Sequence, residues 1–212
     1  MSSFGNTQRL TYNTTNFPIT INEAKSRSKW FKLSPTDTTL DSDIQNFFIP
    51  KAVDQFEKAS GFLIQDQTYK ATIPSLQSPI YKNFEAELIH LNVRTVQDVL
   101  YHPCDWNGND TKTILDTENY IFLEEAGNTP KILQLKACYL SFYEVCNNIQ
   151  TTYVGGYEDN DFTNLPSDIK QCIIMYVADI IDIEKEICNC QGQHDGWITQ
   201  IVNRYSRKTS LM

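Results

Sequence analysis

The segment that starts at Leu165 constrains the fold more than any other part of the sequence. It opens with Pro166, Ser167 and Asp168, and both a proline and an acidic residue favour the first turn of a helix. The apolar residues that follow recur at intervals of three or four, which predicts a core helix with a broad apolar face. These residues are Ile169, Cys172, Ile173, Tyr176, Val177, Ile180, Ile181 and Ile187.

Shorter helices are predicted near both ends of the chain. Thr20 and Glu23 have the spacing of a capping box, in which each side chain accepts a hydrogen bond from the other residue's backbone N–H. They predict a helix from about Ile21 to Trp30. A last helix is predicted from about Trp197 to Tyr205, because its apolar residues fall on one side.

Another helix is predicted between these, after the polar linker 34–39. Gly61 stands where a helix stop belongs, and Pro50 predicts a kink or a restart within the pattern. The apolar face of this helix is expected to consist of Ile44, Phe47, Phe48, Val53 and Phe56.

The middle of the chain has the composition of β-strands, rich in β-branched and aromatic residues. Tight turns are predicted at Asn107-Gly108 and at Asn147-Asn148. The predicted strands are Phe62–Ile73, Phe84–Leu91, Thr95–Tyr101, Thr111–Leu115, Asn119–Leu123, Lys131–Leu135, Cys138–Val145 and Ile149–Val154.

The sequence therefore predicts an α+β fold. A helical body has two N-terminal helices, a long C-terminal core helix and a short last helix, and it carries a central, mostly antiparallel β-rich projection. Residues 1–18 are expected to be an extended arm, ordered only where something covers it. One domain spans 19–205, with helical parts at 19–61 and 165–205 and the β-rich insertion at 62–154, and 206–212 are a tail.

Charge and apolar patterning argue against a tight DNA-binding protein and against a membrane protein. Asp and Glu number 26 against 18 Lys and Arg, for a net charge of -8, whereas gripping phosphates needs clustered Lys and Arg. An acidic surface past which DNA slides remains open, because like charges repel. No run approaches the roughly 18 apolar residues of a membrane span. With no secretory signal recognised, we expect the six cysteines to be mainly free thiols.

No set of residues meets the requirements of a catalytic or cofactor site. The three histidines, His90, His102 and His194, lie apart, and no Gly-x-Ser-x-Gly phrase occurs. Gly155-Gly156 lacks the Lys-Ser/Thr partner of a phosphate-binding loop and is interpreted as a turn at a strand end. We therefore predict no catalytic residue and no cofactor.

Three groups of potential metal ligands were weighed, and no metal is predicted. Cys188, Cys190 and His194 offer zinc ligands, but a fourth would have to come from Asp195 or a distant cysteine. Thiols at a helix end are the favoured interpretation. Two acidic groups lack the spaced loop of a calcium site and are interpreted as solvated carboxylates, namely Asp37, Asp41 and Asp43, and Glu158, Asp159 and Asp161.

Several short phrases, in a fixed order, carry a resemblance to one protein family. The sharpest is Thr152–Tyr157 followed by Leu165–Ile173, similar to a Tyr-x-x-Gly-Tyr, loop, Pro-x-x-Ile-Lys-x-Ala hallmark, with Cys172 in place of the usual Ala. Ile19–Lys25 is similar to the opening helix of that family. The remaining phrases are Leu40–Ile44, Phe56–Gly61, Val93–Tyr101 and Asn119–Phe122, and Ile183–Glu186 departs from the usual Glu-Asn-Arg-Glu. In this order the chain resembles the head–tail connector adaptors of tailed bacteriophages, also called head-completion proteins.

The resemblance implies a structural virion protein and no enzyme. Such a protein forms a dodecameric ring beneath the portal, lengthens the DNA channel and offers a platform to stopper or tail proteins. The implied partners are further copies of the chain, the portal, those stopper or tail proteins and the passing genome without specific binding, with no membrane. The implied location is the neck of the virion, after assembly in the host cytoplasm. Two alternatives stay open: another neck component such as a stopper or tail-completion protein, and a small enzyme with an unrecognised site.

Two sets of residues are candidates for the channel wall of such a ring and for its contact with the portal. Acidic residues are expected to give the channel wall negative potential, namely Asp159, Asp161, Glu184 and Glu186. The segment 203–210 is basic in an otherwise acidic chain, and its Arg204, Arg207 and Lys208 are expected to detach from the core and dock on the portal. Its proposed contact residues are Arg204, Tyr205, Arg207 and Lys208.

Overall fold

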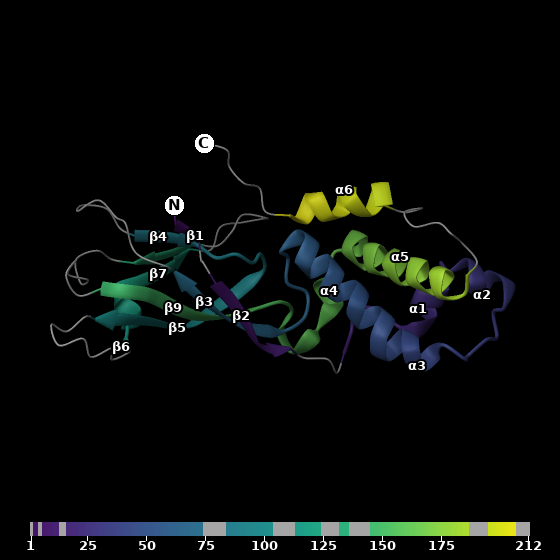
Figure 1. The fold of residues 1–212 in the computed structure, drawn as a ribbon, viewed down its shortest axis with the longest axis horizontal. Helices are drawn as coiled ribbons and strands as arrows, with labels where there is room; N and C mark the ends of the chain where they lie inside the picture. The colour runs from purple at the N-terminus through teal and green to yellow at the C-terminus, as the bar shows by residue number, and fades with distance from the viewer. Residues whose placement is uncertain are drawn as a thin grey trace. The chain divides into compact units, whose positions relative to one another are not determined.

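The computed structural model confirms the α+β fold class, and most of its strands lie between helical segments along the chain (Figure 1). It describes residues 2–3, 6–12, 16–73, 84–103, 113–123, 132–135, 145–186 and 195–206. The chain divides into two compact units. The β unit contains the described residues up to Tyr12 and from Asp66 to Gly156, and the helical unit contains those from Asn16 to Gln65 and from Tyr157 to Ser206.

The helical unit begins with two short helices, α1 (Ile21–Lys25) and α2 (Lys29–Leu33). The predicted capping box is present, because Thr20 N–H donates to the Glu23 carboxylate at 2.8 Å and Glu23 N–H donates to Thr20 Oγ1 at 3.3 Å. The single helix predicted from Ile21 to Trp30 is wrong, since the chain breaks between Lys25 and Lys29.

The break has a cause far away in the sequence, the buried carboxylate of Asp182. It accepts hydrogen bonds from the Ser28 hydroxyl at 2.6 Å, from Lys29 N–H at 3.1 Å and from Trp30 N–H at 3.2 Å. These are the donors that a helix start leaves without partners, and a carboxylate there also opposes the positive end of the helix dipole. Asp182 therefore starts a second helix where the local sequence alone suggests one continuous helix.

The next helical segment contains a π-helical turn, Ile44–Phe48, between α3 (Asp41–Asp43) and α4 (Ile49–Ser60). Ile49 N–H donates to the carbonyl of Ile44, five residues earlier. The wider turn places both Ile44 and Ile49 in the core, although five residues of a regular α-helix would turn them about 140° apart. Pro50 lies in the first turn of α4, so the predicted restart of the helix is confirmed.

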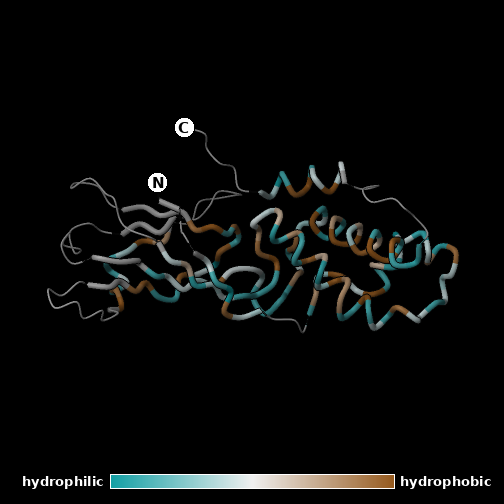
Figure 2. Tube along the Cα trace, in the orientation of Figure 1, coloured by the Kyte–Doolittle hydropathy of each residue, from teal (hydrophilic) through white to brown (hydrophobic). Residues whose placement is uncertain are grey.

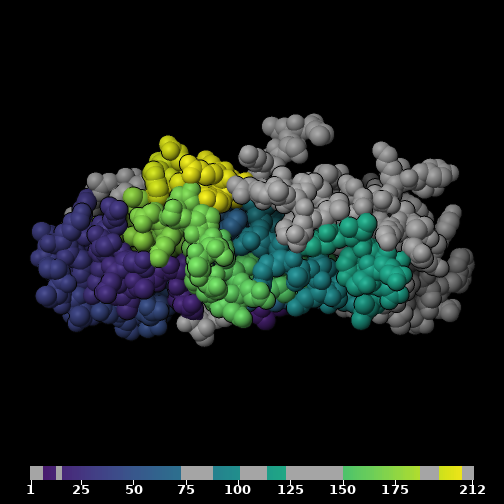
Figure 3. All heavy atoms as spheres, turned by 180° about the vertical axis from the view of Figure 1, so that it is seen from behind, coloured from purple at the N-terminus to yellow at the C-terminus, as the bar shows by residue number. Residues whose placement is uncertain are grey.

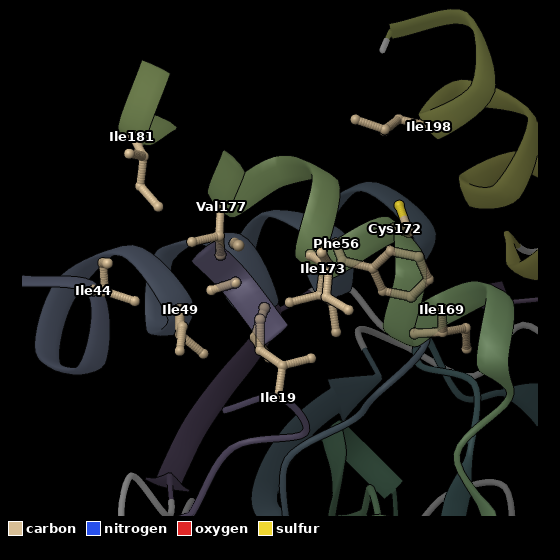
Figure 4. Close-up of a cluster of buried hydrophobic side chains, with 14 of the residues drawn as sticks. Ile19, Ile44, Ile49, Phe56, Ile169, Cys172, Ile173, Val177, Ile181 and Ile198 are labelled. Carbon is tan, nitrogen blue, oxygen red and sulfur yellow. The ribbon is translucent and has the colours of Figure 1, made fainter. Parts of the chain in front are cut away.

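Helix α5 (Ser167–Glu184) is the central element of the helical core, and α6 (Asp195–Tyr205) lies on it (Figures 2 and 3). Ile169, Cys172, Ile173, Val177 and Ile181 are all buried, as the apolar pattern predicted. Figure 4 shows them converging with side chains of α4, the π-helical turn, α6 and the segment before α1, among them Phe56, Ile49, Ile44, Ile198 and Ile19. Tyr176 and Ile180 are half-buried, and Ile187 lies outside the described residues.

The β unit contains two sheets. One has the order β2-β3-β9-β5-β6, with β2 (Asn6–Tyr12), β3 (Gln67–Ile73), β9 (Val145–Gly155), β5 (Val93–Pro103) and β6 (Thr113–Ile114), all antiparallel. The other has the order β1-β4-β8-β7, with β1 (Ser2–Ser3), β4 (Phe84–Glu87), β8 (Ile132–Leu135) and β7 (Tyr120–Leu123), antiparallel except for the β1–β4 pair.

The turn predicted at Asn147-Asn148 is wrong, because both residues lie inside β9. That strand pairs with β3 on one side and with β5 on the other, so its backbone groups have partners along most of its length. At the asparagines the strand pairs with β5 alone, with Asn147 opposite His102, and this pairing outweighs the turn preference of the two residues. The turn predicted at Asn107-Gly108 and nearly all of the strand predicted at Cys138–Val145 lie outside the described residues.

Candidate assembly surfaces

Two of the phrases that carry the family resemblance, Ile19–Lys25 and Leu165–Ile173, meet inside the helical unit. Lys170 Nζ lies 2.7 Å from a carboxylate oxygen of Glu23, which joins α5 to α1, and Ala24 and Ile169 are both fully buried. Lys25 makes an ion pair with Asp41, donates to a backbone carbonyl of the following loop and lies over an aromatic ring. The two phrases therefore hold the fold together, and their charged residues are engaged within the chain.

A third phrase, Phe56–Gly61, contains the C-terminal end of α4. Gly61 ends the helix in the left-handed conformation, with φ 73°. The buried carboxylate of Glu57 then accepts from Ile64 N–H at 2.7 Å and from Gln65 N–H at 2.8 Å. These two bonds fix the last residues of the helical unit before β3 begins.

In the β unit the Tyr-x-x-Gly-Tyr phrase contributes Tyr153 to a buried aromatic cluster. Tyr153 Oη lies 2.7 Å from His90 Nδ1, and the ring of Tyr69 lies 4.1 Å from the His90 ring. Burial lowers the pKa of His90 to about 4 and raises the pKa of Tyr153. Both side chains are therefore uncharged at neutral pH and make a hydrogen bond inside the core.

The acidic residues proposed for the channel wall fall into two pairs. Asp159 and Asp161 precede α5, whereas Glu184 and Glu186 lie at its other end, and all four are exposed. An 18-residue helix is about 27 Å long, so one chain does not bring the pairs together. Asp161 also caps a short helical turn, and its hydrogen bonds from Thr163 lower its pKa.

The basic residues proposed for the portal contact also divide. Arg204 and Tyr205 form the last turn of α6, where Arg204 Nη1 lies 2.7 Å from the Asp168 carboxylate and the Tyr205 hydroxyl donates to it at 2.8 Å. The ring of Tyr205 packs 5.5 Å from that of Phe62. The expected detachment is therefore wrong for Arg204, because these contacts tie the last turn of α6 to α5. Arg207 and Lys208 lie outside the described residues.

Among the potential metal ligands that the structure describes, Asp37 accepts hydrogen bonds from nearby residues of the chain. Asp37 accepts from Thr39 and, at 3.0 Å, from Trp30 Nε1, and these hydrogen bonds lower its pKa to about 2. Within the described residues, His, Cys, Asp and Glu form no group of three that could hold a metal ion. Cys188, Cys190 and His194 lie outside this part of the chain. Cys172 is a free thiol, and burial raises its pKa to about 12.

Several apolar side chains that the sequence placed in the core, or did not single out, are exposed on the helical unit. Phe47 was predicted on the buried face of its helix, and it is 63% exposed. The prediction is wrong because the π-helical turn keeps Ile44 and Ile49 on the core side and turns Phe47 outward. Leu33 and Ile183 are 74% and 49% exposed. Such side chains are candidates for contacts with other chains.

None of the helices in the described part of the chain is long and apolar enough to cross a membrane. No family model and no curated protein sequence matches the chain.

Three solved structures share its fold over almost the whole length. A chain from the neck of an empty GTA particle computed with C6 symmetry has a TM-score of 0.63 and 11% identity, covering 97% of both chains. One from the virion of a native gene transfer agent (GTA) particle has a TM-score of 0.64 and 12% identity, again covering 97% of both. One from the neck of a native GTA particle computed with C12 symmetry has a TM-score of 0.58 and 14% identity, covering 95% of this chain and 98% of that one.

Proposed function

We propose that this protein is a structural component of the neck of a phage-like particle, where it forms a ring adaptor between portal and tail. The observation that carries the proposal is the fold likeness, which spans both units and extends to chains of GTA necks and virions. It agrees with the order of short phrases along the sequence. Two of those necks were computed with sixfold and twelvefold symmetry, which supports a ring of identical copies.

A closed ring needs two different complementary patches on each copy, because each copy contacts one neighbour with one surface and the other neighbour with another. The helical unit offers exposed apolar side chains, Phe47, Leu33 and Ile183, and the β unit offers Ile114, which is 67% exposed. We assign these residues to contacts between copies or with neighbouring neck proteins. No catalytic role is proposed, since the buried polar groups described above serve to hold the fold.

The proposed partners are the portal on one side and stopper or tail proteins on the other, with the genome passing through without specific binding. Asp159, Asp161, Glu184 and Glu186 are proposed to face the channel. Because the two pairs lie at opposite ends of α5, a ring would present them as two separate acidic bands. Arg204, Tyr205, Arg207 and Lys208 remain the proposed portal contact. The proposed location is the virion neck, after assembly in the host cytoplasm.

The test is electron cryomicroscopy of the purified protein assembled with the portal protein of the same particle. We expect twelve copies in one ring on the tail-side end of the portal, with both acidic bands toward the axis. A ring that occupies a sixfold position farther from the portal would identify a stopper-type protein instead. A chain that binds neither the portal nor itself, and is absent from purified particles by mass spectrometry, would refute the structural role.

A further inference from the structure

Strand β2 is an edge strand of the five-stranded sheet in the β unit (Figure 1). It pairs antiparallel with β3, with a register that runs from Asn6 opposite Thr72 to Tyr12 opposite Gln67. Its other side pairs with no strand in the described part of the chain.

The side chains in the middle of β2 face solvent. Those from Gln8 to Thr11 are exposed, and even Leu10, the apolar one, is 47% exposed. The pairing shifts register between Arg9 and Thr11, and there the Thr11 hydroxyl accepts from Thr68 N–H at 3.1 Å. The guanidinium of Arg9 lies 4.3 Å from the ring centre of Tyr12, a contact within the strand itself. Backbone hydrogen bonds to β3, each worth only about 1 kcal/mol net, run along the strand.

The chain is anchored again directly after this strand, at Asn16. The Asn16 side chain donates to the carbonyl of Asn160 at 3.1 Å, and the Asn160 side chain donates back to the carbonyl of Asn16 at 3.4 Å. Asn160 is 1% exposed, and both anchored residues belong to the helical unit. Any displacement of β2 from β3 therefore ends at Asn16. From there, four Cα–Cα steps reach Tyr12, at most about 14 Å.

We infer that, in the assembled ring, β2 of each copy pairs with β3 of the next copy. The inference rests on the proposed ring. The β2 strand of a neighbouring copy fits beside β3, because β3 already pairs with residues 6–12 of its own chain and every neighbour carries the same residues. Exchange reproduces each contact that it breaks, so its cost is confined to opening an edge strand.

With exchange, β2 has a role both in the free chain and in the assembled ring. In the free chain it covers the edge of β3 of its own copy. In the ring the same strand links each copy to its neighbour, and the link is complete only when the ring closes. The length of chain between Asn16 and Tyr12 sets a geometric condition. Gln67 of the next copy must lie close enough for Tyr12 to pair with it.

The experiment uses two single substitutions at a pair of residues that face each other across β2 and β3. Gln8 and Lys70 are Cα partners, and opposite residues in a sheet lie within the Cα–Cα range of a disulfide. Chains with Gln8→Cys are mixed in equal amounts with chains with Lys70→Cys, assembled with portal and mildly oxidised. A link between positions 8 and 70 can then form only between two copies. The linked peptides are identified by mass spectrometry, which separates them from products of the six native cysteines.

We expect the link in assembled rings, at about a quarter of the contacts in a randomly mixed ring, and none in the same mixture without portal. Rings that assemble without the link would overturn the exchange and leave the adaptor role intact, whereas the absence of rings from wild-type protein mixed with portal would overturn both. A link that forms equally without portal would overturn the coupling of exchange to assembly. Should the variants fail to assemble, a map of the wild-type ring decides, because the chain from Asn16 must lead to β3 of its own copy or of the next.

Discussion

Stability at mildly acidic pH should depend on His90, and the structure gives both the sign and the size of the effect. Burial lowers the pKa of this imidazole from 6.5 to about 4. The unfolded chain therefore binds a proton between these values that the folded chain does not, so stability is complete above about pH 6.5 and falls as the pH decreases.

The size follows from the two pKa values. At about pH 5 the unfolded histidine is almost fully protonated and the folded one is almost fully neutral, which costs the folded state about 2 kcal/mol relative to about pH 7.5. Below about pH 4 the loss reaches a limit of about 3 kcal/mol.

The assay is urea denaturation of the wild type and of His90→Asn at both pH values. Asparagine places a polar atom near the position of Nδ1, where it can still bond to the Tyr153 hydroxyl, but it does not titrate. The other acidic groups and histidines are common to both proteins, so the difference between the two losses isolates His90. We expect the wild type to lose about 2 kcal/mol more than the variant. Equal losses would refute the reasoning, as would a His90 pKa near 6.5 by NMR titration.

Three further predictions concern single side chains of the helical unit. Glu57→Ala should lower the free energy of unfolding by about 3 kcal/mol, because Ile64 N–H and Gln65 N–H lose their acceptor, whereas Glu57→Gln keeps one oxygen and should cost about 1 kcal/mol. Urea denaturation checks this, and equal losses would count against it. Asp182→Ala should cost about 2 kcal/mol by the same assay through loss of the α2 cap, and a loss within error of zero would show that the cap contributes nothing. Phe47→Asp should leave the melting temperature within a few degrees but reduce the yield of portal-bound rings at least about tenfold. The control, Gln55→Asp, changes an exposed residue of the following helix and should leave the yield unchanged. Equal yields for the two variants would remove Phe47 from the interface.

The likeness between this chain and the GTA neck and virion chains holds at 11–14% identity, and the internal contacts show what several residues of the short phrases do in this chain. Glu23, Lys25, Glu57 and Lys170 each bond to a distant part of the helical unit or stabilise its turns. Buried or half-buried charged groups tolerate few replacements, because removing one partner leaves the other without compensation. The residues of these phrases are therefore engaged in holding the fold together.

The sequence by itself determined the features that depend on residues close together along the chain. The capping box at Thr20, the helix stop at Gly61, the restart at Pro50 and the apolar face of α5 are all interactions or patterns within about one to five helical turns. The α+β fold class follows from the same local patterns, since the central stretch has strand composition and the flanking stretches have helical periodicity.

Only the tertiary structure decided the features that depend on residues far apart in the sequence. Asp182, 154 positions from Ser28, separates α1 from α2, and Asp168 fixes the end of α6. Pairing with the distant strand β5 keeps the segment with Asn147 and Asn148 extended. Phe47 is exposed because the π-helical turn serves the burial of its neighbours. In each case a contact made on folding contributes more free energy than the local preference that it overrides, and sequence patterns record only that preference.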